Sequence, residues 1–265
     1  MSKISQRFTE LIDLTAFPIG QLFFDAPQEM EIQQGNKTIK YYKVNIGSQN
    51  KGGVGEFVFD VPFFCHSFGV EEFQNEAGKA TNHNVSLSLI DSNGTPEDQE
   101  TQLNWVKSFQ AVMDKIKDHL VSIKKEIKKP TLDKNELKNL NPVRQSIDED
   151  GNPKGNAWYF SPKLMERKIY NKEDPSDIQI KIETQFFLDG QTDEQGNPVE
   201  ISPLEFLGKK HFKFRGAVKL ENVYVGSKIS LQCKIYDGVV RPVSNERKRL
   251  TQLSKSVSDV LLEDD

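Results

Sequence analysis

The residues most able to do chemistry in this sequence are cations and aromatic rings that alternate over residues 207–250. This stretch holds eleven Lys and Arg side chains against three carboxylates, whereas the whole chain has a formal net charge of −4. Four rings lie among the cations, namely Phe212, Phe214, Tyr224 and Tyr236. Because cations neutralise phosphates and rings stack on unpaired bases, the pattern predicts binding of single-stranded nucleic acid.

Alternation within this stretch indicates which side chains would bind. Neighbouring side chains of a strand point to opposite faces, so Phe212 and Phe214 would face a core while Lys213 and Arg215 face solvent. Lysines on exposed strands also prevent aggregation, and that interpretation explains the alternation but not the concentration of charge. The candidate contacts here are Lys209, Lys210, Lys213, Arg215, Tyr224, Lys228, Lys234, Tyr236 and Arg241.

A second candidate surface lies at residues 157–170, AWYFSPKLMERKIY. Three aromatic residues are consecutive there, so at least one of them must face outwards if the segment is a strand. A core Trp and Phe beside a Tyr at the surface is the competing interpretation. The candidate contacts in this segment are Tyr159, Lys163 and Arg167.

Two other patterns could carry metal or nucleophile chemistry, and we favour a structural role for both. Cys65 and His66 are adjacent, but no zinc-ligand spacing accompanies them, and the apolar run VPFFCHSF favours a buried thiol. The segments DEDGNPKG (148–155) and DEQGNPVE (193–200) resemble calcium loops, but Ala157 stands where the first would need a bidentate Glu. Their Gly and Asn-Pro residues indicate turns. We therefore expect no catalytic site, no metal and no cofactor.

One long helix is predicted over residues 96–128. Thr95 can cap its first turn, Pro96 suits the first helical position, and Pro130 would end it. Apolar residues recur between these limits at spacings of three and four, which gives one continuous stripe for burial.

Strands are predicted before and after this helix, and a short amphipathic helix at residues 3–16. The strands are expected at residues 37–46, 54–61, 85–90, 157–160, 164–170, 178–188, 211–225 and 227–237, with Pro62 ending the second. This order predicts a mainly β (α+β) fold with a helical insertion. The expected architecture is an antiparallel barrel of the oligonucleotide-binding (OB) type, or a small sandwich, carrying the one long helix.

The chain is expected to form a single domain over residues 1–243, followed by a charged tail at residues 244–265. The tail ends in SDVLLEDD, an acidic tip that could compete with nucleic acid or dock replication and repair proteins. An ordinary solubilising terminus is the alternative. Two cysteines are too few for a disulfide framework and indicate a reducing, intracellular compartment. No stretch approaches the ~18 consecutive apolar residues that a membrane helix needs.

Two segments, FKFRGAVKLENVYVGSKISLQCKIYDGVV (212–240) and YFSPKLM (159–165), carry a resemblance to a known family. They resemble the single-stranded-DNA-binding proteins of nucleocytoplasmic large DNA viruses, of the African swine fever virus type. The resemblance implies an elaborated OB-type fold that coats single strands during viral DNA replication, repair or recombination. It implies phosphate contacts by Lys163, Lys213, Arg215, Lys228 and Lys234, and stacking on Tyr159 and Tyr224.

Together these observations predict a non-enzymatic protein that binds single-stranded DNA with little sequence preference. RNA is the alternative polymer, and the oligomeric state stays open. A virion or scaffold protein that uses the same sheet for protein contacts is the alternative function. A viral origin would place the protein in the host cytoplasm or virus factory, and in the virion.

Overall fold

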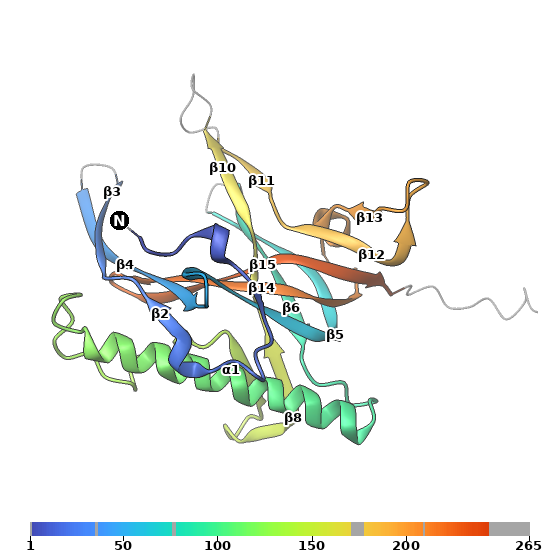
Figure 1. Ribbon diagram of the computed structural model, residues 1–265, viewed down its shortest axis with the longest axis horizontal. Helices are drawn as coiled ribbons and strands as arrows, with labels where there is room; N and C mark the ends of the chain where they lie inside the picture. Colours follow the sequence, from blue (N-terminus) through green and yellow to red (C-terminus); the bar gives the residue numbers. More distant parts are fainter. Residues whose placement is uncertain (1, 35–36, 76–77, 171–177, 209, 244–265) are drawn as a thin grey trace, which may run out of the picture.

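The fold is known from a computed structural model that describes residues 2–34, 37–75, 78–170, 178–208 and 210–243. Within these residues it contains one α-helix, a thirteen-stranded mixed sheet and a separate two-stranded ribbon (Figure 1). Lys209 and the predicted tail with its acidic tip lie outside the described residues, so the tail hypothesis stays a prediction.

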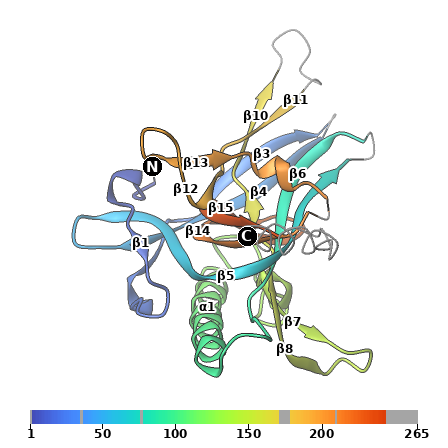
Figure 2. The same cartoon turned by 90° about the vertical axis from the view of Figure 1, so that its right-hand side faces the viewer.

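The strands confirm the predicted order of strands, helix and further strands. Those before the helix are β1 (Leu11–Ile12), β2 (Leu22–Phe24), β3 (Gln28–Gln34), β4 (Lys37–Gln49), β5 (Val54–Gln74) and β6 (Ala80–Ser88). Those after it are β7 (Val143–Ile147), β8 (Pro153–Phe160), β9 (Lys163–Leu164), β12 (Gln185–Thr192), β13 (Pro198–Ile201), β14 (Phe212–Val225) and β15 (Ile229–Pro242). The ribbon consists of β10 (Glu166–Tyr170) and β11 (Ile178–Ile182). Figure 2 shows this ribbon projecting at the end of the molecule opposite to helix α1.

The sheet curls around strand β5 but does not close into the small antiparallel barrel that the sequence predicts. Along its length β5 pairs with β1, β4, β6 and β14, while β7, β8, β12 and β13 extend the sheet outwards. The prediction that Pro62 ends this strand is wrong. Pro62 lies where β5 bulges against β14, between the partner pairs Val61–Gly216 and Cys65–Phe214, so its missing N–H interrupts no regular ladder.

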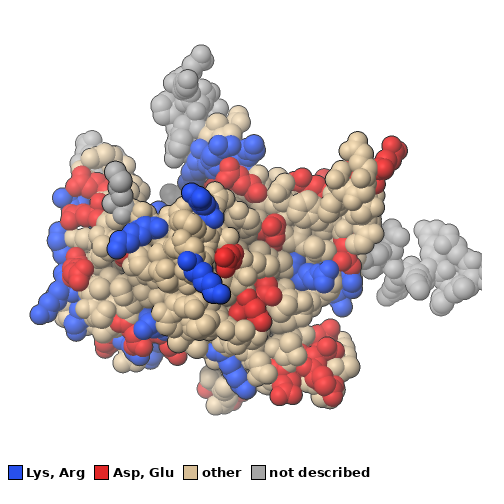
Figure 3. Space-filling model, viewed as in Figure 1, with Lys and Arg blue, Asp and Glu red and all other residues tan. Residues whose placement is uncertain are grey.

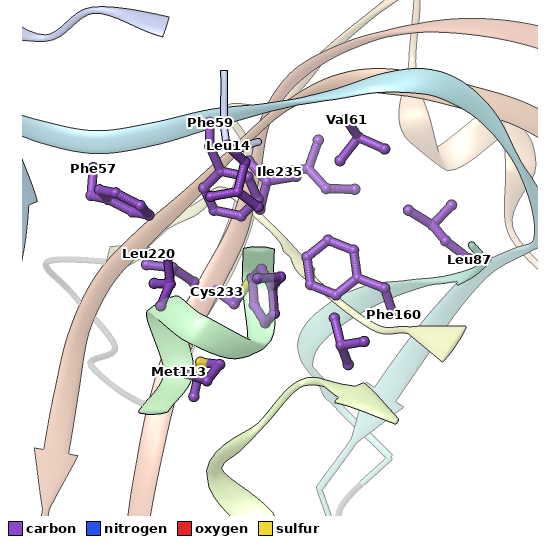
Figure 4. Packing of buried hydrophobic residues seen from close by; sticks show 14 of the residues in the cluster. Leu14, Phe57, Phe59, Val61, Leu87, Met113, Phe160, Leu220, Cys233 and Ile235 are labelled. Carbon is purple, nitrogen blue, oxygen red and sulfur yellow. The ribbon is translucent and has the colours of Figure 1, made fainter. Parts of the chain in front are cut away.

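Helix α1 (Pro96–Ser122) packs against the inner face of the sheet. It begins as predicted, because Thr95 and Asp98 form a reciprocal capping box and Pro96 takes the first turn. Its buried stripe includes Trp105, Phe109 and Met113, which lie against Phe59 and Phe160 from the sheet. Figure 4 shows how strand residues such as Phe57, Leu220 and Ile235 gather over Met113.

The predicted helix end at residue 128 is wrong by six residues. Turns follow Ser122, and Lys128 adopts a left-handed conformation with φ of 54°. Ile127 lies outside the helix but is buried, because the turns after Ser122 fold back and place its side chain in the core. The helical spacing of apolar residues in the sequence therefore continues past Ser122, although the helix itself ends there.

Two further predictions about local structure are wrong. Residues 3–16 form no α-helix but a 3₁₀ turn (Gln6–Phe8) and strand β1, because this segment lies close against β5 at Gly55, where a Cβ would collide with the Phe8 backbone. Residues 178–188 break into β11 and β12 at Thr184, whose buried hydroxyl accepts from the Met165 N–H and donates to the Ile235 carbonyl.

Other predictions are confirmed. Phe212, Phe214 and Cys65 are buried in the core, and burial raises the pKa of the Cys65 thiol. Asp148 and Asp193 each accept backbone hydrogen bonds from residues two and four positions later, which identifies the two acidic segments as turns. Within the described residues, no helix combines the length and the apolar character that a membrane crossing needs.

Candidate nucleic-acid interface

A row of polar and aromatic side chains crosses six strands on the outer face of the sheet, away from α1. Its members are direct neighbours across successive strands: Arg241 of β15, Lys213 of β14, His66 of β5, Ser88 of β6, Tyr159 of β8 and Arg144 of β7. Lateral neighbours in a sheet point to the same face, so all six lie on the outer face of the curled sheet. Neighbouring strands lie about 4.8 Å apart, which makes this outer row about 24 Å long.

Two further rings from β5 border the outer row. Phe64 and Phe68 lie two residues before and after His66, so strand alternation places them on the same face. Phe68 is 40% exposed, and its ring centroid lies 6.3 Å from that of Tyr159. Together with Lys213 and His66, these two phenylalanines line a cavity that opens beside the start of the loop to α1. The outer row and its border thus place the exposed ring of Phe68 and the half-buried rings of Phe64 and Tyr159 beside cations, a combination suited to stacking on unpaired bases.

Two arginines meet on one of these rings at the β15 end of the row. The guanidinium carbons of Arg215 and Arg241 lie 4.9 Å and 4.1 Å from the centroid of Phe64. Both guanidinium groups also pair with Asp189 of β12. This carboxylate occupies the position at which a phosphate could bind the same two arginines.

A histidine pair lies in the middle of the outer row. The His66 Nε2 and His211 Nδ1 atoms are 3.0 Å apart, so one ring must donate a hydrogen bond to the other. Burial, together with the nearby His211 and Lys213, lowers the pKa of His66 below its ordinary value of 6.5. Near neutral pH His66 therefore contributes a polar ring rather than a positive charge.

A second row of lateral neighbours consists of Lys219 of β14, Lys234 of β15, Lys163 of β9 and Asn84 of β6. Two of its lysines are neutralised locally: Lys219 pairs with Glu56 at 2.7 Å and Lys234 with Glu221 at 2.6 Å. Glu221 belongs to the 207–250 stretch itself, whereas Glu56 and Asp189 lie outside it, so these two acids partly offset the charge excess of the stretch.

The structure brings some of the predicted contacts together and separates others. Tyr159, Lys163, Lys213, Arg215, Lys234 and Arg241 lie in or beside the two rows. Arg167 pairs with Glu183 on the ribbon, where basic side chains gather (Figure 3). Lys210 and Lys228 are exposed in loops.

Two predicted rings have other partners. Tyr236 accepts a hydrogen bond from Gln6, and Tyr224 packs edge-on against Tyr41 at a centroid distance of 5.5 Å. Burial also raises the pKa of Tyr224. Neither ring belongs to the outer row.

Sequence reasoning missed five residues of this surface: Phe64, His66, Phe68, Ser88 and Arg144. The period-two pattern Phe64, His66, Phe68 would have indicated an exposed strand face, but we predicted that Pro62 ends the strand. Ser88 and Arg144 carry no distinctive local pattern and become neighbours of the others only through strand pairing. Among the described residues, no group of three His, Cys, Asp or Glu side chains is placed to hold a metal.

Comparisons with known proteins include a remote structural likeness and a viral relative. The solved structure of gp2.5, a single-stranded DNA binding protein encoded by bacteriophage T7, aligns with 74% of this chain and 97% of its own at 13% identity. The TM-score of 0.36 is too low to support an inference from that protein. The Early 31 kDa protein of Frog virus 3 (isolate Goorha) is 25% identical over 258 residues, which cover 95% of this chain and 88% of the relative.

A family model matches residues 18–263, which is most of the chain. The match runs from the segment before β2 to beyond the last described strand, so it includes every member of both rows. The chain therefore belongs to the family described as protein of unknown function (DUF2738).

Proposed function

We propose that this protein binds single-stranded DNA along the outer row, with little sequence preference. The observation that supports the proposal is that the row combines three cations (Arg241, Lys213, Arg144) with the rings of His66 and Tyr159 across six strands, bordered by Phe64 and Phe68. Unpaired bases would stack on the rings while the cations follow the phosphates. Duplex DNA keeps its bases stacked inside and could use only the cations.

The wider setting is also part of the proposal. The family resemblance in the sequence supports an OB-like fold of the African swine fever virus type and a role in viral DNA replication, repair or recombination. The similarity to a viral early protein supports a viral setting. We propose no enzymatic activity, because the neighbours Ser88 and His66 are engaged elsewhere: the Ser88 hydroxyl donates to the Ile90 carbonyl, and the His66 ring pairs with His211.

Fluorescence anisotropy with labelled single-stranded and duplex oligonucleotides at roughly 50 and 200 mM salt tests the proposal. We expect tighter binding of the single strand and a log–log salt slope of about 0.7 per phosphate neutralised. The variant Arg144→Ala/Lys213→Ala should weaken binding. Its matched control, Lys107→Ala/Lys115→Ala, removes two exposed cations of α1 and should not. Equal or tighter binding of duplex DNA would contradict the proposal.

Protein contacts, as in a virion or scaffold protein, are the second candidate function. The β3–β4 hairpin exposes the cross-strand pair Ile32 and Ile39, which are 52% and 42% exposed, beside Met30. Exposed apolar groups of this kind mark protein contact sites. Gel filtration distinguishes single-strand binding from scaffolding. A stable oligomer whose mass does not change when oligonucleotide is added would favour scaffolding.

A further inference from the structure

A cavity of about 400 Å³ lies beyond Tyr159, at the β7–β8 end of the outer row. Its walls come from β6, β7, β8, β9, the segment before β7 and the start of β15. Tyr159 forms one wall of this cavity. Its neighbour Phe68 lines the cavity described above beside Lys213 and His66. The two cavities therefore flank a pair of rings on the same face of the sheet.

The charges in this cavity are of one sign. Arg144 and Lys163 line it, and none of its described lining residues is Asp or Glu. The three other cavities described on the molecule each include a carboxylate, namely Asp91, Glu72, and Glu56 with Glu221. The cavity beyond Tyr159 is thus suited to an anion such as a phosphate.

The remaining polar walls are mainly amides. Asn84, Asn139, Asn141 and Gln232 line the cavity, and an amide can donate and accept at once. The Asn84 Oδ1 atom is buried and has no hydrogen-bond partner among the described residues. A buried acceptor without a donor is costly, so a ligand that supplies an N–H group would bind favourably here.

The ring, the amides and the cations of this cavity match the face of a base, the edge of a base and a phosphate, respectively. Tyr159 offers a stacking face, Arg144 and Lys163 offer charge to a phosphate, and the amides offer hydrogen bonds to the edge of a base. We infer that this cavity holds one unpaired nucleobase of the bound strand, with the adjacent phosphate on the two cations. The inference rests on the proposed function. The rest of the proposed surface tolerates any sequence. The cavity would be the position on it at which the identity of the base affects affinity.

The test compares the affinities of dA, dC and dT homopolymers of one length, by anisotropy. For the wild-type protein we expect a spread of about tenfold, the low end of what one good bidentate amide contact contributes to base discrimination. Asn84→Ala and Gln232→Ala, tested separately because they lie on different strands, should each reduce that spread to about threefold or less. Lys213→Ala, outside the cavity, should weaken all three polymers in parallel and leave the spread intact.

The outcomes separate this inference from the proposed function. Equal wild-type affinities, or a spread that survives both amide variants, would overturn the nucleobase site while single-strand binding stands. A parallel loss for all polymers in the amide variants would assign the cavity to the backbone track and overturn base reading. No binding of any single strand would overturn the proposed function itself.

Discussion

Tyr159 and Tyr224 were both predicted to stack on bases, and their surroundings now distinguish them. Tyr159 lies between Ser88 and the cation Arg144 in the outer row, whereas Tyr224 already packs on Tyr41. We expect Tyr159→Ala to cost about 1–3 kcal/mol of single-strand binding, roughly five- to hundredfold in Kd, because one stacking platform is lost. Tyr159→Phe should keep most of the affinity. A titration in which Tyr224→Ala is as damaging as Tyr159→Ala would refute this assignment.

Asp189 occupies the two arginines at the β15 end of the outer row and so should limit their access to phosphates. Its carboxylate pairs with both Arg215 and Arg241, so a phosphate must displace it to reach either guanidinium group. Asp189→Asn should tighten single-strand binding by roughly three- to tenfold and steepen the log–log salt slope by about 0.7, the contribution of one more phosphate contact.

The matched control for this prediction is Asp114→Asn, which removes a carboxylate paired with Lys117 on α1. Both variants change the net charge equally, so a general electrostatic effect would tighten binding in both. Only the variant at Asp189 should respond if the effect is local. Weaker binding by Asp189→Asn would show that the carboxylate positions the arginines rather than blocking them.

At the level of elements, α1 supports the inner face of the strands whose outer face carries the row. Phe109 is fully buried and contacts Phe59, Trp105 and Phe160. Phe109→Ala should lower the free energy of unfolding by about 3–5 kcal/mol, through lost burial and a residual cavity. Urea denaturation measures this, and the exposed Lys107→Ala should stay within about 0.5 kcal/mol of wild type. A small effect of Phe109→Ala would mean that the helix is not essential to the core.

The elements with strong local signals could be predicted from the sequence. Strands β4, β14 and β15 have alternating or β-branched residues, and Thr95 with Pro96 fixed the start of α1. The end of α1 and the continuation of β5 could not be predicted. Ile127 satisfies a helical pattern while packing from a turn, and Pro62 is tolerated because β5 bulges there.

The site was less predictable than the elements, because it depends on strand register. The basic stretch contains Lys213 and Arg241, which are partners across β14 and β15. His66, Ser88 and Arg144 join them only through long-range pairing. A shift of one residue in any of these ladders would turn the side chains inwards. No local pattern in one sequence specifies such a register.

For the whole molecule, two half-buried histidines make stability depend on pH. His119 stacks on Phe24 with ring centroids 4.0 Å apart, and burial lowers its pKa below the ordinary 6.5, as it does for His66. The unfolded chain therefore binds protons more readily than the folded protein as pH falls through about 6.5, so acidification destabilises the fold. Urea midpoints at about pH 7.5, 6.5 and 5.5 should fall in that order.

The variant His119→Phe tests the cause of this pH dependence. It keeps a ring against Phe24 but cannot take up a proton, so its urea midpoint should fall less between neutral and acidic pH than that of the wild type. A fall identical to that of the wild type would assign the effect to other groups, among them His66.

The outer row runs perpendicular to the strands, and this direction fixes the interval between its side chains. The interval equals the distance across main-chain hydrogen bonds, so substitutions can change the chemistry of each position but not its spacing. The spacing of the binding positions in the row is therefore set by the backbone. A polymer bound along the row would also link six strands crosswise, in the direction in which hydrogen bonds and the connecting loops hold the sheet together.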